Sequence, residues 1–410
     1  MGVLNTLTAL PRAAVVVAVG YLGVLTGAAW TTRSRDRPTP LDRPDLRLCV
    51  LIPAHDEATG IGATLISLQA SDYPSELVDV HVVADHCTDA TADVVRWHGF
   101  HVHERDGERP GKGPALTWLL DRLSETSRER FDAYVFVDAD TVVAPDALSH
   151  LAAAIAAGHA VVQGHYAVRD PDQTGVVAFR AAALAARTYL RPLGRTALGG
   201  SAGLYGTGMA FRADVAAGLR WSGHLTEDVE THLELLEHGI LVAFAPAARF
   251  EAEMPTTLAA AASQHERWER GRAQLATGAV PRLLRGALRG GPVSRRAYLD
   301  AALDQAVPPF SVVVLASAVW ASVATLRLVS VPHDQGARRD AAVAALTLTT
   351  QATYVWCALR LVDSSPAVVR SLWTEGPRML WWKVRLWARV VSTSGGGTWV
   401  RTTRNAAVTS

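Results

Sequence analysis

Three long apolar stretches dominate the hydrophobic pattern of the chain. Residues 13–32, 305–326 and 341–359 contain no Asp, Glu, Lys or Arg. A helix needs ~20 such residues to cross a bilayer, so each stretch is predicted to be a membrane span. A cleaved signal peptide is the alternative for the first stretch. Its apolar core is longer than the usual ~7–15 residues, and arginines follow it, which favours a retained anchor.

Basic residues beside these stretches predict their orientation. They follow the first stretch (Arg33, Arg35, Arg37, Arg43, Arg47), precede the second (Arg282, Arg285, Arg289, Arg295, Arg296) and follow the third (Arg370, Arg378, Lys383, Arg385, Arg389). Such clusters favour the cytoplasmic side of a membrane. We therefore predict a multi-pass protein of the cell (plasma) membrane, with its N-terminus outside and residues 33–303 in the cytosol. Tryptophans interleaved with basic residues at 379–389 favour a helix in the headgroup layer.

Shorter apolar runs alternate with helical periodicity between the first two spans. The pattern predicts strands at 48–53, 78–85, 101–104 and 133–138, and helices at 61–70, 90–99 and 114–123. Strands separated by helices of about ten residues are typical of a parallel, doubly wound α/β sheet. Ligands bind such sheets beyond the carboxyl ends of the strands. Asp85, Asp138 and Asp140 fall at those ends.

Composition excludes several classes of protein. Apolar residues make up 49% of the chain and charged residues 19%, which excludes a disordered protein. The 40 Lys and Arg residues balance 39 Asp and Glu residues to a net charge of +1, so nothing indicates nucleic acid as a partner. Cys49, Cys87 and Cys357 lie far apart, which indicates neither a disulfide framework nor a zinc site.

The predicted crevice lacks the usual nucleotide-binding loops. No G-x-G-x-x-G follows the first strand, and the P-loop-like run 107–113 has Gly113 where Ser or Thr would hold magnesium. A diphosphate would therefore need a metal ion and basic side chains. Asp138 and Asp140, two residues apart on an extended segment, point the same way and suit Mg²⁺ or Mn²⁺. A D-x-D pair alone is more often a solvated loop.

Four sequence elements together resemble the family 2 glycosyltransferases. They are the runs 52–57 (IPAHDE), 83–85 (VAD) and 138–140 (DAD), and the pair formed by 226–228 (TED) and 264–268 (QHERW). The resemblance is to the membrane-anchored branch that includes cellulose, hyaluronan and ceramide glucosyl transferring enzymes. It covers residues 48–275, and it rests on the order and spacing of the motifs.

The resemblance implies a GT-A type, Rossmann-like nucleotide-sugar-binding α/β domain with transmembrane helices on both sides. The expected division of the chain is an anchor at 1–32, a cytosolic glycosyltransferase domain at 33–256, an amphipathic interfacial segment with the Q-x-x-R-W motif at 257–303, two transmembrane helices at 304–362, and a cytosolic or interfacial tail at 363–410.

The resemblance also implies roles for individual residues. It assigns nucleotide-sugar contacts to Pro53, Glu57, Asp85, Lys112, Asp138 and Arg267, metal ligation to Asp138 and Asp140, general base catalysis to Asp228, and acceptor contacts to Gln264, Trp268 and Glu227. Two positions depart from the family pattern. Asp56 stands where Asn is frequent, and Ala84 replaces the first Asp of the usual Asp-Asp pair, leaving Asp85 as its only carboxylate.

The chemistry of sugar transfer fits these residues. Transfer with inversion needs a base for the acceptor hydroxyl and charge stabilisation on the departing diphosphate. Thr226 is predicted to cap a helix starting near Glu227, and the helix N-terminus would favour an ionised Asp228. Ordinary acidic preference at a helix start also explains Glu227 and Asp228. The glycines from Gly199 to Gly208 predict either a loop beside the substrate or a flexible linker.

We therefore predict an inverting, metal-dependent enzyme that uses Mg²⁺ or Mn²⁺. It would move a hexose or N-acetylhexosamine from a UDP-sugar to a lipid-linked or membrane-associated glycan acceptor, in contact with membrane lipids. One alternative is a processive polysaccharide synthase. Another, from a different class, is a membrane scaffold that binds nucleotide sugar without turning it over.

Overall fold

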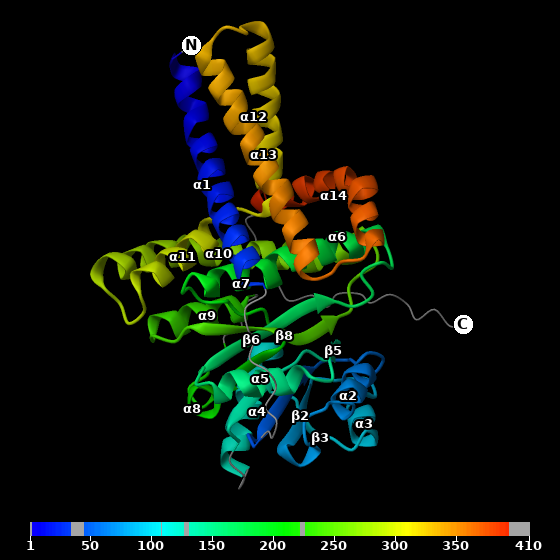
Figure 1. The fold of residues 1–410 in the computed structure, drawn as a ribbon. Helices are drawn as coiled ribbons and strands as arrows, with labels where there is room; N and C mark the ends of the chain where they lie inside the picture. The colour runs from blue at the N-terminus through cyan, green and yellow to red at the C-terminus, as the bar shows by residue number, and fades with distance from the viewer. Residues whose placement is uncertain (1, 34–44, 108, 127–130, 222–225, 393–410) are drawn as a thin grey trace.

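The computed structural model describes residues 2–33, 45–107, 109–126, 131–221 and 226–392 (Figure 1). The arginines predicted to orient the first span at positions 35, 37 and 43 lie outside these residues. An eight-stranded sheet forms the centre of the α/β part, in the order β3-β2-β1-β4-β7-β6-β8-β5. Its strands are β1 Leu48–Ala54, β2 Val78–Asp85, β3 His101–Arg105, β4 Ala133–Phe136, β5 Thr141–Val143, β6 Val161–Val168, β7 Met209–Arg212 and β8 Val242–Ala252.

Half of the sheet has the predicted parallel, doubly wound arrangement. Strands β3, β2, β1 and β4 run parallel to one another, and helices α2 (Ile61–Gln69), α3 (Thr91–Trp97) and α4 (Lys112–Thr126) connect β1, β2, β3 and β4 in turn. Beyond β4, outside the predicted strands, the sheet is mixed. Strand β7 is antiparallel to both β4 and β6, β5 is antiparallel to β8, and β6 and β8 are parallel. Strand β7 runs antiparallel to β4 because the loop before β7 enters the sheet at the carboxyl end of β4, where Met209 pairs with Phe136.

Alternation along β1 explains how the sheet is buried on both faces. Leu48, Val50 and Ile52 join a core with α2 and with helix α5 (Ala147–Ala156), whereas Cys49 and Leu51 join a second core with α4. Because successive strand side chains point to opposite faces, a continuous apolar run covers both sides. The central strands are thereby fixed in register, with Leu48 opposite both Val78 and Ala133.

The three apolar stretches form helices α1 (Gly2–Thr32), α12 (Phe310–Ser330) and α13 (Gln335–Leu361). Within the described residues, these are the helices long and apolar enough to cross a membrane. They stand together away from the sheet, with the start of α1 and the α12–α13 turn at the far end (Figure 1). Asp340 joins the three near that end, since it pairs with Arg12 at 3.2 Å and accepts a hydrogen bond from Trp320 Nε1 at 2.9 Å.

Further helices lie between the sheet and the three spans. A continuous helical segment consists of α6 (Gly175–Leu184), the π-helix η2 (Ala185–Leu190) and α7 (Arg191–Ala197). It is accompanied by α9 (Glu227–Glu237), α10 (Leu258–Arg289), α11 (Arg295–Ala306) and α14 (Pro366–Ser392), while the one-turn elements η1 (Ser75–Leu77) and α8 (Ala213–Ala216) lie beside the sheet. Helix α14 contacts α6, α10 and α12, at the sheet-side end of the spans (Figure 1).

A close backbone contact joins α1 to this layer. A Cβ atom on Gly194 of α7 would lie 2.4 Å from the carbonyl oxygen of Leu25. We therefore expect Gly194→Ala to lower the free energy of unfolding by about 1–3 kcal/mol, because a backbone atom cannot move aside. Gly27→Ala on α1, which would meet nothing within 4 Å, is the matched control. Thermal unfolding in detergent checks both variants, and equal melting temperatures would contradict the close contact.

Candidate active site

The predicted crevice lies where β1, β2 and β4 end. Pro53 lies on β1, Glu57 follows it, Asp85 ends β2, and Asp138 lies two residues beyond β4. All four residues line one cavity of about 1720 Å³. The sequence-based grouping of these residues is therefore present in the fold, because parallel strands place their carboxyl ends on one edge.

Lys112 is the cation of this crevice. It begins α4, and its Nζ lies 2.5 Å from Asp138 Oδ1 and donates to the carbonyl oxygen of Gly206 at 2.8 Å. Burial alone would lower the pKa of Lys112, but Asp138, Glu227 and Asp228 outweigh it and raise this pKa above its ordinary value. The side chain is thus a permanent positive charge among carboxylates.

Asp138 and Asp140 lie in a turn, not on the extended segment that was predicted. The strand ends at Phe136, and the Thr141 amide donates to the Asp138 carbonyl oxygen at 3.1 Å, which closes the turn. The Asp138 amide in turn donates to Thr207 Oγ1 at 3.1 Å. Both carboxylates still line the cavity. Two hard oxygen donors open to substrate phosphates are the kind of site that Mg²⁺ or Mn²⁺ takes, so the residues fit such an ion.

Asp85 is buried and its carboxylate is held by protein groups. It accepts hydrogen bonds from Arg105 and from the Gly111 amide, the latter at 2.8 Å, and His86 Nδ1 lies 3.0 Å away. Gly111 directly precedes Lys112. Asp85 therefore fixes the start of α4 and, with it, the position of the lysine in the crevice.

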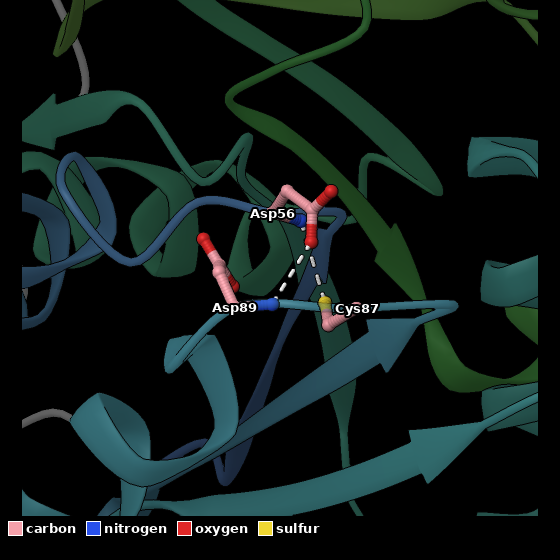
Figure 2. A group of neighbouring side chains, drawn as sticks. All are labelled: Asp56, Cys87 and Asp89. Carbon is pink, nitrogen blue, oxygen red and sulfur yellow. Dashed lines mark hydrogen bonds between the residues drawn. The ribbon is translucent and has the colours of Figure 1, made fainter.

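A second carboxylate group lies beside the crevice in the loops after β1 and β2. Asp56, Cys87 and Asp89 come within reach of one ion (Figure 2). Asp56 Oδ1, however, accepts from the amides of Thr88 at 2.7 Å and Asp89 at 3.3 Å, and burial raises the pKa of the Cys87 thiol. These contacts indicate a clamp between two loops. The residue that departs from the family's Asn is thus a structural acceptor, for which a carboxylate is suited.

Glu227 and Asp228 begin α9 and line the cavity. Thr226 occupies the predicted cap position, but its side chain makes no capping hydrogen bond. Asp228 Oδ1 instead accepts from the Val229 amide at 2.8 Å. Burial raises the pKa of Asp228 above its usual range and that of Glu227 to about 7. The expected effect of the helix N-terminus on Asp228 is therefore outweighed by desolvation, which favours the protonated carboxyl.

The Q-x-x-R-W motif lies on α10. The side chains of Gln264 and Arg267 are outside what the structure describes, so their predicted contacts stay predictions. Trp268 lines the cavity, and Arg180 of α6 lies over its ring at 4.1 Å from the centroid. Sequence reasoning did not find Arg180, because nothing in the spacing of α6 and α10 indicates that they meet.

The glycine-rich segment 199–208 is a fixed loop, and the flexible-linker interpretation is wrong. Its backbone is tied to the sheet by hydrogen bonds from Ala202 to Val242 and from Gly208 to Phe136, both at 2.9 Å. Gly206 has a φ of +85°, and a Cβ there would lie 3.3 Å from Lys112 Nζ. Glycine is required at this turn for both reasons. The loop therefore lies beside the lysine, and its predicted place beside the substrate stays a prediction.

The same cavity continues to the membrane-side helices. Its walls there are Phe310 and Val314 of α12, Val355 and Leu359 of α13, and several apolar residues of α14 (Val369, Leu372, Met379, Leu380). One continuous space thus joins the carboxylates at the sheet edge to apolar side chains on helices of membrane-spanning length. The sequence alone did not predict this extension of the cavity toward the membrane-side helices.

The family model described as "Glycosyltransferase like family 2" matches residues 44–271, more than half of the chain. The chain belongs to the family 2 glycosyltransferases. It is a glycosyltransferase with a GT-A type α/β fold, and candidate membrane helices lie on both sides of that domain. No curated protein matches it by sequence.

Solved structures with a similar arrangement are distant in sequence. A mannosyltransferase from Pyrobaculum calidifontis, in complex with GDP-Man and Mn²⁺, is 19% identical over 86% of this chain and 100% of its own, with a TM-score of 0.47. S. aureus TarS 1-349 is 14% identical over 78% and 91%, with a TM-score of 0.42. Glucosyl-3-phosphoglycerate synthase from Mycobacterium tuberculosis, with Mn²⁺, UDP and glucosyl-3-phosphoglycerate, is 20% identical over 55% and 78%, with a TM-score of 0.39.

Proposed function

We propose that this glycosyltransferase is an inverting, metal-dependent enzyme of the cell membrane. It moves a hexose or N-acetylhexosamine from a UDP-sugar to a lipid-linked or membrane-associated glycan acceptor, with its α/β domain in the cytoplasm. The observation that carries the proposal is the single cavity that runs from Lys112, Asp138 and Asp228 to the apolar side chains of α12 and α13. A soluble donor would enter at the sheet edge, and a lipid-borne acceptor from the membrane side.

In this proposal, different residues of the chain assist separate parts of the reaction at the anomeric carbon. Asp228 accepts the proton of the acceptor hydroxyl while the hydroxyl oxygen forms the new glycosidic bond. The bond between the sugar and the nucleoside diphosphate breaks, and its electron pair leaves on the phosphate oxygen. Lys112 neutralises part of the charge that builds up on the leaving group. Asp138 and Asp140 would hold Mg²⁺ or Mn²⁺, which when bound stabilises the diphosphate.

A release assay tests the proposal against its rivals. Purified full-length protein in nanodiscs is incubated with a panel of UDP-sugars and Mg²⁺ or Mn²⁺, and free UDP is measured. We expect metal-dependent release with a preferred sugar. Binding of UDP-sugar without release would favour the scaffold, and a polymeric product would favour the processive synthase. Release from another nucleotide sugar alone, under matched conditions, would overturn the choice of uridine.

A further inference from the structure

A fully buried glutamine holds the glycine-rich loop of the candidate site. Gln163 lies on β6, which runs between β7 and β8 in the sheet. It does not line the cavity, which excludes direct contact with a substrate there. An amide inside a sheet core is costly unless hydrogen bonds replace those it made to water. The burial of Gln163 is therefore favourable only if both ends of its amide are paired.

Both ends of this amide are paired with the loop backbone on either side of Gly206. The Oε1 atom of Gln163 accepts a hydrogen bond from the Tyr205 amide at 3.0 Å, and its Nε2 donates to the carbonyl oxygen of Thr207 at 2.9 Å. The Nε2 atom also donates to the carbonyl oxygen of Gly164 at 2.9 Å, on its own strand. One side chain therefore fixes the residues before and after Gly206 at the same time.

The loop residues held in this way contact two charged residues of the crevice. The carbonyl oxygen of Gly206 accepts a hydrogen bond from Lys112 Nζ at 2.8 Å. The hydroxyl oxygen of Thr207 accepts a hydrogen bond from the Asp138 amide at 3.1 Å. The lysine and the first residue of the D-x-D motif are thus both held by the short stretch of backbone that Gln163 fixes.

The two ends of the loop are anchored without this glutamine. Near one end, Ser201 Oγ accepts a hydrogen bond from the Val242 amide at 2.9 Å. At the other end, the Gly208 amide donates to the carbonyl oxygen of Phe136 at 2.9 Å. A change at Gln163 would therefore release the middle of the loop and leave its ends attached to the sheet. Such a change alters positions within the site and leaves the fold in place.

We propose that Gln163 is a positioning residue for the sugar-transfer reaction. Through the loop at 205–207 it sets the places of Lys112 and of the Asp138 turn, the two groups that would meet the diphosphate of the donor and its metal ion. This inference rests on the proposed function and adds to it a residue outside the cavity. Side chains that orient metal ligands act through geometry, and their loss typically costs about 10–100-fold in metal affinity or activity.

Binding of Mn²⁺ to the full chain in nanodiscs, with UDP present, tests this role separately from catalysis. Gln163→Met keeps the length of the side chain but can neither accept from Tyr205 nor donate to Thr207. We expect it to weaken Mn²⁺ binding about tenfold and to lower the transfer turnover by about 10–100-fold. Thr207→Val, which removes the hydroxyl that accepts from the Asp138 amide, should weaken Mn²⁺ binding by a similar factor. Because both residues act through one set of contacts, the double variant should lose much less than the product of the two factors.

Tyr73→Phe is the matched control for stability. Tyr73 is buried, does not line the cavity, and donates a hydrogen bond to the carbonyl oxygen of Leu46 at 2.8 Å. This variant therefore also removes a buried hydrogen bond to the backbone, but at a distance from the loop. Its melting temperature should fall while its Mn²⁺ affinity and its turnover stay at the values of the unaltered protein.

Three results would overturn the inference. If Gln163→Met lowers the melting temperature but keeps the normal Mn²⁺ affinity and turnover, the glutamine has only a structural role. If the losses of Gln163→Met and Thr207→Val multiply in the double variant, the two residues act independently. If Gln163→Met does not fold, a normal Mn²⁺ affinity of Thr207→Val would have the same meaning. Unaltered protein that binds Mn²⁺ and UDP but transfers no sugar would sink the proposed function alone, because the Mn²⁺ affinities of the variants still test the positioning role.

Discussion

Replacement of Asp228 by Asn is expected to reduce sugar transfer by ~10²–10⁴-fold, the usual contribution of a general base. The amide keeps the shape of the side chain and can still accept from the Val229 amide, so α9 should start at the same residue. What it loses is the ability to take a proton from the acceptor hydroxyl. The measurement is the single-turnover rate at saturating UDP-sugar, with donor affinity determined in parallel.

The control for this variant is Asp214→Asn. Asp214 is an exposed carboxylate of the same domain that pairs with Arg212 at 2.6 Å and does not line the cavity. It should keep the full transfer rate. If Asp228→Asn transfers sugar at the normal rate while binding the donor normally, Asp228 is not the base, and the acidic start of α9 has only its ordinary structural role.

The pH dependence of the rate should report the same group. Burial raises the pKa of Asp228, and a base must be ionised to act, so the rate should fall as the pH falls through this raised pKa. The neighbouring Glu227, with a pKa of about 7, holds a proton at lower pH and couples to the same titration. The acidic limb is therefore expected above the ordinary carboxyl range. A limb near pH 4 would contradict the desolvated environment.

The sequence is sufficient to predict the parallel half of the fold. The four strands and three helices between Leu48 and Phe136 are found within a few residues of their predicted ends. Strands β1, β2 and β4 are mostly buried and rich in apolar residues, the edge strand β3 is partly exposed, and each helix shows its own periodicity. Asp85, Asp138 and Lys112 could be grouped for the same reason, since strand ends alone bring them to one edge.

The mixed half of the sheet and the membrane-side end of the cavity depend on tertiary contacts that leave no local pattern. Strand β7 has only four residues, and its direction follows from where the glycine loop meets Phe136. Arg187 and Arg272 are 85 positions apart on different helices, and both line the cavity. Each arginine alone looks like a helix surface residue, and only the fold shows that they share one cavity. The capping hydrogen bond predicted for Thr226 is absent, and Asp228 accepts from the Val229 amide at the start of the same helix.

Removal of the divalent metal is expected to abolish transfer, and Asp140→Asn to reduce it by about 10²-fold. An ion on the diphosphate supplies several kcal/mol of charge stabilisation, and a loss of about 3 kcal/mol corresponds to about a hundredfold in rate. Asp140 is a cleaner target than Asp138, whose carboxylate also holds Lys112. The measurement is the transfer rate after chelation and its recovery as Mg²⁺ or Mn²⁺ is added back.

The decisive quantity is the metal concentration that gives half recovery, because the chain offers a rival carboxylate group. If Asp138 and Asp140 hold the ion, Asp140→Asn should raise that concentration, whereas Asp89→Asn in the group of Figure 2 should leave it unchanged. The Asn side chain can still accept from the Ala58 amide, which Asp89 Oδ2 now does at 3.0 Å, so the loop clamp persists. The opposite result would move the metal to the loops after β1 and β2. Transfer that survives chelation in both variants would leave Lys112 as the counter-charge for the leaving diphosphate.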